Sequence, residues 1–376
     1  MARRYGVVSC VLLVAASVWG AQPERLAQLW GGDHWLSRAG IDWSFVYMAE
    51  LSAKVTGPGV RPGADLRGDA SLYMTLDTAA AKLWPGGQVV LHVQSQHGAT
   101  ASDRLGDYHC LSNITGGDFV QLAQLYYRHD FAGGHWLKIG KQEGNDDFAG
   151  SEYTSCCLNS SAAFMPLMPL PSSPDQAWGI TAGLRTSPHT SVNLGAFRDK
   201  YGHQPVYFAQ PNLSYQISSH PGNVSAGWWW DTNDYASVNT VTPLTYRGSY
   251  GYYLTFDQEL ARATSAEDDP RGVGLFGHFA WAPRDRSAAR TGWAVGAEWT
   301  GPLPGRPDDR FAAAIYQVGF DQRTGFPYST ETAIEALYSA QALPWLVVKG
   351  SVQYITHPGG TGPEAVVLGT RVETTF

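Results

Sequence analysis

Apolar and polar side chains alternate along long segments of this chain, and this alternation limits the possible folds more than any other feature. From Ile41 to Val55 every second residue is apolar, and polar residues occupy most positions between them. A period of two places the two sets on opposite faces of an extended strand. Strands of globular proteins usually have about five or six residues. The sequence therefore predicts an unusually long strand with one apolar face.

The same alternation recurs about sixteen times, which predicts an all-β fold. The expected strands are 41–55, 69–79, 88–97, 119–129, 135–142, 177–186, 190–198, 211–218, 223–232, 249–260, 272–282, 291–300, 310–320, 332–342, 345–356 and 364–376. Connectors after even-numbered strands tend to be short, and those after odd-numbered strands are often long. The clearest cases are 130–134, 187–189 and 343–344 on the short side, and 98–118 and 143–176 on the long side. This parity is typical of a transmembrane antiparallel β-barrel with short periplasmic turns and long extracellular loops.

The N-terminus has the pattern of an export signal. Arg3 and Arg4 precede an apolar run that ends at Trp19, and the small residues Gly20 and Ala21 follow. The run is short for a transmembrane helix, and no later stretch of about 18 apolar residues occurs. We therefore predict a cleaved signal peptide at 1–21, a periplasmic segment at 22–40 and a barrel at 41–376, with a membrane anchor as the alternative to the signal peptide.

Composition and aromatic placement narrow the class of protein further. Charged residues make up 16% of the chain and the formal net charge is -7, which disfavours a nucleic-acid-binding protein. Aromatic residues occur near the ends of predicted strands, at Trp43, Trp281, Trp299, Tyr354 and Phe376. Membrane barrels have such aromatic girdles, with the apolar face turned outward to lipid. A soluble barrel with its aromatic residues inside remains the alternative.

Several motifs resemble the carbohydrate-selective porins of the Gram-negative outer membrane, the OprB family. The C-terminal part contains Gln353-Tyr354, the turn Pro358-Gly359-Gly360, then Gly369-Thr370-Arg371 and a terminal Phe376. A second match joins Ile139-Gly140-Lys141 to 145–148 and 158–161, and a weaker third match lies at Ser112-Asn113-Ile114. The resemblance covers roughly residues 35–376. It implies a sixteen-stranded barrel in which the loop 143–176 folds inward and narrows the pore.

A sugar channel needs polar groups that exchange hydrogen bonds with hydroxyls and still let the sugar leave. The polar faces of the predicted strands supply the lumen-facing candidates Asp42, Glu50, Asp77, Arg128, Arg185, Lys349, Gln353, Arg371 and Glu373. The inward loop supplies Asp146, Asp147, Glu152 and Tyr153. For each strand residue, a purely structural position as a solvated wall residue or as part of an internal ion pair is weighed equally with a role in the pore. For Asn145, Asn159 and Ser160 a turn-forming role is favoured.

Two smaller patterns have two interpretations each. The run Trp228-Trp229-Trp230 suggests either sugar stacking or a membrane girdle, and in a strand Trp229 faces away from its two neighbours. Cys110 either forms a disulfide with Cys156 or Cys157 or stays a free thiol, and the sequence leaves both outcomes open.

The pattern as a whole predicts passive carbohydrate diffusion across the outer membrane, with mono- or oligosaccharides as solutes. The alternatives are a general or other small-solute porin and, less favoured, a secreted or periplasmic β-rich carbohydrate-active protein. No pattern of an enzyme active site, cofactor or metal site occurs, so we expect neither catalysis nor a cofactor. The expected partners are outer-membrane lipid and the barrel-assembly machinery, for which Phe376 is the predicted signal, and the resemblance is compatible with a homo-oligomer.

Overall fold

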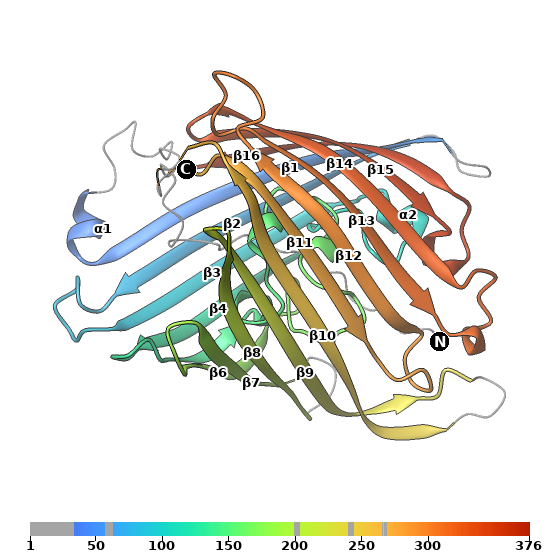
Figure 1. Cartoon of the computed structure of the whole chain (residues 1–376), viewed down its shortest axis with the longest axis horizontal. Helices are drawn as coiled ribbons and strands as arrows, with labels where there is room; N and C mark the ends of the chain where they lie inside the picture. Colours follow the sequence, from blue (N-terminus) through green and yellow to red (C-terminus); the bar gives the residue numbers. More distant parts are fainter. Residues whose placement is uncertain (1–33, 57–62, 199–203, 240–243, 265, 267–268) are drawn as a thin grey trace.

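The computed structural model describes residues 34–376 except 57–62, 199–203, 240–243, 265 and 267–268. The predicted signal peptide and most of the predicted periplasmic segment lie outside the described residues. The described part forms one closed barrel in which each strand pairs with its neighbours in sequence, and the first strand pairs with the last (Figure 1). All pairings are antiparallel, as the alternating connectors predicted.

The described residues contain sixteen strands, and each overlaps one of the predicted runs. They are β1 Ile41–Thr56, β2 Gly63–Asp77, β3 Gly87–Gly98, β4 Phe119–Asp130, β5 Trp136–Gln142, β6 Ala177–Arg185, β7 Thr190–Arg198, β8 Pro205–Ile217, β9 His220–Ala236, β10 Thr245–Arg262, β11 Gly272–Trp281, β12 Ala289–Thr300, β13 Arg310–Phe320, β14 Thr330–Leu343, β15 Leu346–Thr356 and β16 Ala365–Thr375. The longest are β9 and β10, with 17 and 18 residues, and their hairpin projects beyond the rest of the barrel (Figure 1).

The apolar face of each strand points outward. On β1, Leu51 and Val55 are about half exposed, whereas Glu50 and Ser52 on the opposite face are buried. The same division holds on β4, where Val120 is 77% exposed and Gln124 is buried. An apolar outer wall around a polar interior is the arrangement of a membrane barrel and the reverse of a soluble one. The alternation therefore reflects lipid on the outside and a polar lumen on the inside.

The barrel closes next to the C-terminus. β1 pairs with β16 from Val46 opposite Thr375 to Thr56 opposite Val366. Phe376 continues this pairing, since its backbone N–H donates to the carbonyl of Phe45 at 2.8 Å, and the two rings lie 5.6 Å apart. The terminal aromatic residue thus lies on the closing seam of the barrel.

The two ends of the barrel differ as the connectors predicted. Short turns such as 131–135, 186–189 and 344–345 join strands at one end, which is the periplasmic end of a membrane barrel, and long loops leave the opposite, extracellular end. The short helix α1, His34–Arg38, precedes β1 at the periplasmic end (Figure 1). Within the described residues no helix is long and apolar enough to cross a membrane.

Candidate pore constriction

The loop 143–176 folds into the barrel and packs there as a protein core does. It contains three short 3-10 turns, Gly144–Asp146, Glu152–Thr154 and Ser160–Ala162, and the green ribbon of this loop lies inside the ring of strands in Figure 1. Phe148 in the loop is fully buried, and its ring lies 5.4 Å from that of Phe208 on β8. The predicted inward loop is therefore confirmed, and part of the lumen is filled by an apolar core.

A second loop, 99–118, also lies inside the barrel, which the sequence reasoning did not predict. It carries the short helix α2, Ser102–Leu105. Backbone hydrogen bonds join it to the first loop, from Asn113 N to Leu158 O at 2.7 Å and from Ser160 N to Cys110 O at 2.9 Å. The two loops therefore form one inner layer against the barrel wall.

The three cysteines of the described chain lie in this inner layer, and all three are buried free thiols. Asn159 accepts a hydrogen bond from Ser161 N and so caps the third 3-10 turn, as its preferred turn-forming role requires. Packing and hydrogen bonds therefore hold the two loops together.

Buried glutamates on the wall hold the inner layer by accepting its backbone N–H groups. Glu335 on β14 accepts from Leu158 N at 2.9 Å and from Asn159 N at 3.4 Å, and it also receives the hydroxyl of Tyr316. Glu331 on the same strand accepts from the backbone N–H groups of Tyr108, His109 and Gly359. A buried carboxylate is tolerated when several donors satisfy it. These contacts therefore fix where the loops stand in the lumen.

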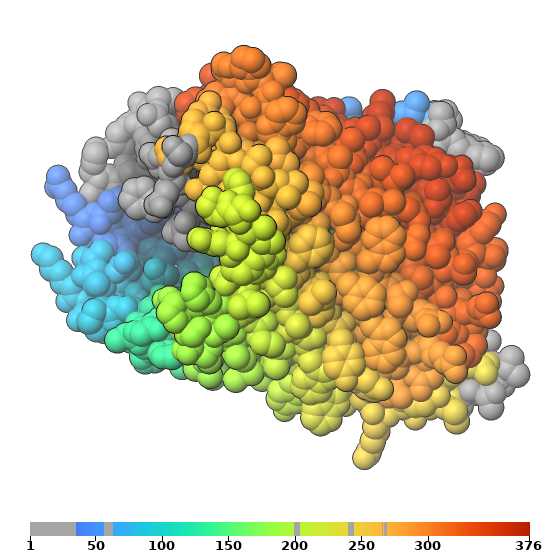
Figure 2. Space-filling model, viewed as in Figure 1, coloured from blue at the N-terminus to red at the C-terminus, as the bar shows by residue number. Residues whose placement is uncertain are grey.

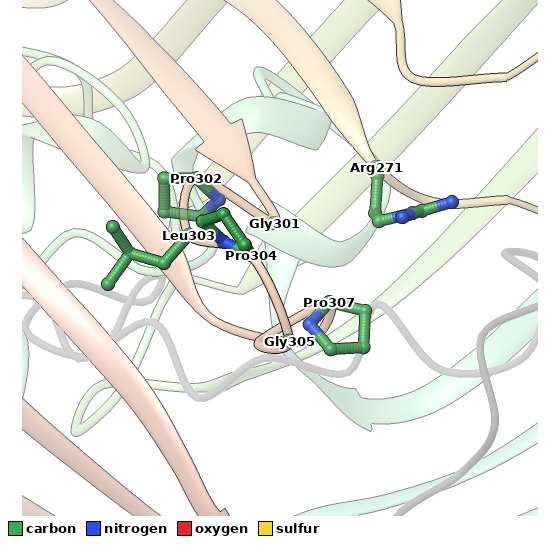
Figure 3. A pocket seen from close by; sticks show the side chains of 7 residues that line it. All are labelled: Arg271, Gly301, Pro302, Leu303, Pro304, Gly305 and Pro307. Carbon is green, nitrogen blue, oxygen red and sulfur yellow. The ribbon is translucent and has the colours of Figure 1, made fainter.

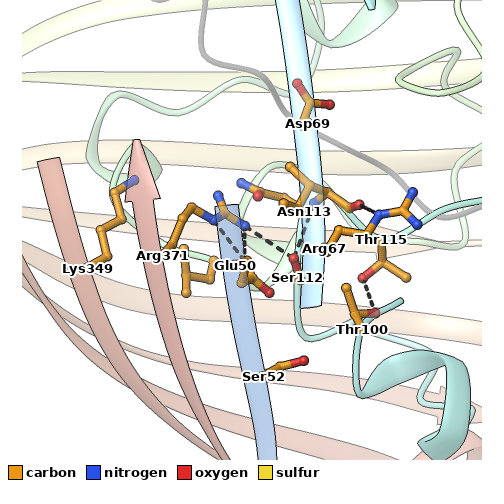
Figure 4. A network of polar contacts seen from close by, with 12 residues as sticks. Glu50, Ser52, Arg67, Asp69, Thr100, Ser112, Asn113, Thr115, Lys349 and Arg371 are labelled. Atoms are coloured by element: carbon orange, nitrogen blue, oxygen red, sulfur yellow. Dashed lines mark hydrogen bonds and ion pairs between the residues drawn. The ribbon is translucent and has the colours of Figure 1, made fainter. Parts of the chain in front are cut away.

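Two buried arginines hold the 99–118 loop from the other side (Figure 4). The guanidinium of Arg67 on β2 donates to the carbonyls of Ile114 at 2.8 Å and Gly117 at 2.9 Å. The guanidinium of Arg371 on β16 donates to Glu50 on β1 at 2.8 Å and to the hydroxyl of Ser112 at 3.2 Å. A plane of five N–H donors suits this role, because one side chain can serve a carboxylate and a loop at once.

The predicted residues Glu50, Gln353 and Arg371 thus face the lumen but are covered by the 99–118 loop. Gln353 donates to the carbonyl of Leu111 at 2.6 Å and accepts from Asn159 at 3.1 Å. Glu50, Gln353 and Arg371 are each 2% exposed. Their side chains lie on the inner face of the barrel, where they are buried and contact the loops.

Four other predicted residues lie at the periplasmic end of the lumen. Asp77 accepts from the backbone N–H groups that follow it at 2.8 and 3.0 Å, and so caps a turn. Arg185 donates to the carbonyl of Ser187 in the next turn, and Arg128 pairs with Asp130 at 2.8 Å. Asp42 is exposed at the second position of β1. These residues surround the periplasmic mouth, away from the inward loop.

Asp146 and Asp147 of the inward loop lie beside a lysine that the sequence reasoning missed. Lys138 on β5 is 2% exposed, and its ammonium group lies 2.8 Å from Asp147 and 3.6 Å from Asp146. The hydroxyl of Thr181 on β6 donates to Asp147 at 2.9 Å. One buried lysine therefore balances part of the negative charge of the loop, and Asp146, with a side chain 20% exposed, keeps access to water.

Glu152 and Tyr153 lie at the exposed edge of the same loop. Glu152 is exposed, and Tyr153 packs over Gly274 on β11, where any added side-chain carbon would overlap its ring. Desolvation by the surrounding protein raises the pKa of Glu152, and the nearby carboxylate of Glu259 raises it further. Burial and the same carboxylates raise the pKa of the Tyr153 hydroxyl, which therefore stays protonated and can donate a hydrogen bond.

Ion pairs follow the wall, and those of Glu259 and Glu298 lie next to this edge. On β10, Arg262 donates to Glu259 at 2.5 Å. On β12 and β13, Arg310 lies 3.4 Å from Glu298 and donates to Ser155 of the inward loop at 2.5 Å. On β15 and β16, the predicted residues Lys349 and Glu373 pair at 2.9 Å.

The site residues that the sequence reasoning missed share a feature that is visible in the sequence, namely a charged side chain within or next to a predicted strand. Lys138, Glu335, Glu298 and Arg310 are charged residues within the predicted strands, and Glu331 directly precedes the predicted strand 332–342. A charged residue inside a transmembrane strand is expected to face the lumen.

Two further features lie away from the constriction. Trp229 is buried in the core inside the barrel, whereas Trp230 is 46% exposed on the outer wall, as alternation along a strand requires. A hollow of about 440 Å³ lies at the periplasmic turn after β12 (Figure 3). It is lined by Arg271, Gly301, Pro302, Leu303, Pro304, Gly305 and Pro307. The inward loop does not contribute to it.

Comparison with known proteins identifies the family. Residues 62–376 match the model described as carbohydrate-selective porin, OprB family. The chain belongs to this porin family. Porin B of Pseudomonas aeruginosa is 22% identical to it, over 96% of this chain and 93% of the relative.

Solved structures of other channels share the fold of this porin. OprB of Pseudomonas putida at high pH has a TM-score of 0.84 at 18% identity, and the match covers 96% of this chain and all of that one. OmpT of Vibrio cholerae in a trimer form has a TM-score of 0.54 at 12% identity, over 89% and 99% of the two chains. The family and the fold are those of an outer-membrane channel, as the sequence motifs implied.

Proposed function

We propose that this porin lets mono- or oligosaccharides diffuse passively across the outer membrane, and that the space beside the inward loop is the selective passage. Family membership supports the solute class. The observation that carries the proposed position is the loop edge at Glu152 and Tyr153, which lies beside paired ions of the wall.

The chemistry of the edge suits neutral, hydroxyl-rich solutes. A sugar hydroxyl both donates and accepts, so it needs acceptors and donors close together. The pairs of Glu259 with Arg262 and of Glu298 with Arg310 provide both within a few ångströms. Because each charge already has a partner, a sugar exchanges hydrogen bonds without leaving an unpaired charge behind, and its binding stays weak enough for release.

In this proposal the exposed groups contact solute and the buried ones act through the loop. Glu152, Tyr153, Asp146 and the exposed part of Arg310 are the contact residues. Glu335, Glu331, Arg67 and Arg371 are positioning residues, since they hold the loops and are buried. In this proposal the periplasmic mouth is shaped by four residues that were predicted to face the lumen, namely Asp42, Asp77, Arg128 and Arg185.

The remaining predictions about maturation and assembly belong to the same proposal. Residues 1–21 direct export and are removed, residues 22–40 stay in the periplasm, and Phe376 is read by the barrel-assembly machinery. The position of Phe376 on the closing seam supports the last point. An oligomer stays a prediction, and chemical cross-linking of intact outer membranes followed by gel analysis tests it.

Solute flux into proteoliposomes tests the proposed function. We expect rapid, size-limited entry of glucose and of short oligosaccharides, and slower entry of an amino acid of similar size. Equal entry of all three would favour the alternative of a general porin. A variant with Glu152→Gln and Tyr153→Phe should lose the preference for sugars and keep the total flux, with Glu364→Gln in an exposed extracellular loop as the control.

A further inference from the structure

The extracellular ends of β10 to β12 carry exposed arginines that differ from most others in the described chain. Most arginines of the described chain pair with a carboxylate. Arg247, Arg284 and Arg290 are exposed, and none has a carboxylate within ion-pair distance among the described residues. An exposed guanidinium without a protein partner is available to an anion from outside.

Packing of the connecting loop holds these three arginines in one region. The loop 282–288 joins β11 to β12 and lies against the β9–β10 hairpin, where Val238 N donates to Asp285 O at 3.0 Å. Arg286 of this loop stacks 4.2 Å over the ring of Tyr246 and donates to Gly248 O at 2.8 Å. The loop carrying Arg284 is therefore fixed beside the strand end that carries Arg247.

The acidic residues nearby do not cancel this positive charge. Asp285 is occupied by Arg286 at 2.9 Å, and Asp321 of the next loop by Arg323 at 3.1 Å. Asp234 lies opposite Arg247 in the strand register, without an ion pair to it. The region therefore keeps a positive potential, which we call the arginine rim and define as Arg247, Arg284 and Arg290.

Directly next to the arginine rim, six aromatic rings form a continuous cluster on the outer wall. The ring pairs Tyr207–Trp230, Trp228–Trp230, Tyr250–Trp281, Tyr250–Tyr252 and Tyr252–Trp281 have centroid distances between 5.9 and 6.4 Å. Trp230 faces Tyr250 across β9 and β10, which connects the two halves. In Figure 2 the yellow strands β9 and β10 form part of the outer wall that faces the viewer.

Strand geometry places this aromatic cluster at the extracellular boundary of the lipid. A strand rises about 3.3 Å per residue, or roughly 2.5 Å along the membrane normal at a tilt of about 40°. An apolar band about 25 Å tall therefore takes roughly ten residues. Trp230 lies about ten residues after His220, the periplasmic start of β9. Trp281 is the last of the 10 residues of β11, which starts at Gly272 on the periplasmic side. The arginine rim comes next along these strands, at the height of the outer-leaflet headgroups.

We propose that the arginine rim and the aromatic cluster together bind a phosphate-bearing glycolipid of the outer leaflet. The guanidiniums bind the phosphate oxygens, which a planar fork of donors matches well. The rings of Trp230, Tyr250 and Trp281 pack on the sugar and the first acyl carbons below them. This inference depends on the membrane location of the barrel, and sugar selectivity of the pore does not enter it.

Native mass spectrometry of the intact porin in detergent tests the proposal. The probes are lipid A with two phosphates, the same lipid with its phosphates removed, and inorganic phosphate as competitor. We expect the wild type to retain the phosphorylated lipid far more than the dephosphorylated one. Each arginine near a charged headgroup contributes about 1 kcal/mol, or roughly a fivefold change in affinity. The triple variant Arg247→Gln/Arg284→Gln/Arg290→Gln should therefore bind roughly 100-fold more weakly.

A matched variant removes three positive charges from the periplasmic side, namely Arg38→Gln/Arg271→Gln/Arg306→Gln, and should retain the lipid as the wild type does. Equal retention of both lipids by the wild type, or unchanged retention by the rim variant, would overturn the proposal. Displacement of the lipid by inorganic phosphate supports recognition of the headgroup. If the triple variant does not fold, the single variant Arg284→Gln in the exposed loop tests the same proposal, since its affinity for the phosphorylated lipid should fall roughly fivefold.

Discussion

The contact between Glu335 and the inward loop allows the sharpest test of how the pore is shaped. Its carboxylate is the acceptor for Leu158 N, Asn159 N and the hydroxyl of Tyr316. All of these groups are buried, and Glu335 itself is 0% exposed. Replacing Glu335 with Ala removes the acceptor and leaves three buried donors without a partner.

The size of the effect on the loop follows from the two donors that belong to it, Leu158 N and Asn159 N, since Tyr316 lies on the wall strand β13. A buried donor left unpaired costs about 1–3 kcal/mol. Taking the lower end for each, because water can enter the space, gives about 2 kcal/mol for the loss of loop anchoring. A difference of this size raises the ratio of detached to attached loop roughly 30-fold. Glu335→Gln keeps one acceptor oxygen, and we expect it to lose only about 1 kcal/mol, roughly fivefold in the same ratio.

Single-channel recording in planar bilayers measures this effect directly. Glu335→Ala should show a larger and noisier open-channel current, with weaker block by added oligosaccharide, and Glu335→Gln should fall between it and the wild type. Glu364→Ala, which changes an exposed extracellular glutamate, should behave as the wild type. If Glu335→Ala folds into a heat-modifiable barrel and has wild-type current and sugar block, the loop is held by something other than these hydrogen bonds.

Three further predictions test other parts of the structure. Because the pKa of Glu152 is raised, the wild type should lose its preference for cations as the pH falls through that raised value. Glu152→Gln should have a low preference for cations at every pH. Reversal potentials measure this preference, and parallel curves of reversal potential against pH for the two proteins would contradict the prediction. Gly274→Val should displace Tyr153 and weaken sugar block of the current, whereas Gly350→Val, where an added carbon meets open space, should have no effect. Arg371→Gln should leave Glu50 as an unpaired buried charge and lower stability by about 3–5 kcal/mol, measured as urea-induced loss of the folded gel band. Arg128→Gln, whose partner Asp130 is exposed, should change stability little.

The sequence by itself determined the strands and the two faces of each, and it favoured a membrane barrel. Alternation with a period of two depends only on neighbouring residues, so each strand and its polar face could be predicted locally, as β13 at 310–320 illustrates. Connector lengths distinguished the turn end from the loop end. The apolar residues of β1 and β4 then faced lipid as predicted, because charged groups such as Glu50 and Lys138 can only be accommodated inside.

Only the tertiary structure decided which inward residues meet the pore. Glu50 and Arg371 are 321 residues apart in the chain, and both are covered by a loop that begins near residue 99. Alternation gives the face of a residue, but it contains no information about the path of a loop across the lumen. That path depends on many weak contacts made at once, such as Glu335 with Leu158 and Arg67 with Ile114, between segments distant in sequence. For this reason Glu152 stays exposed at the loop edge. Gln353 is also polar and lies on the inner face of the barrel, but it is buried beneath the loops.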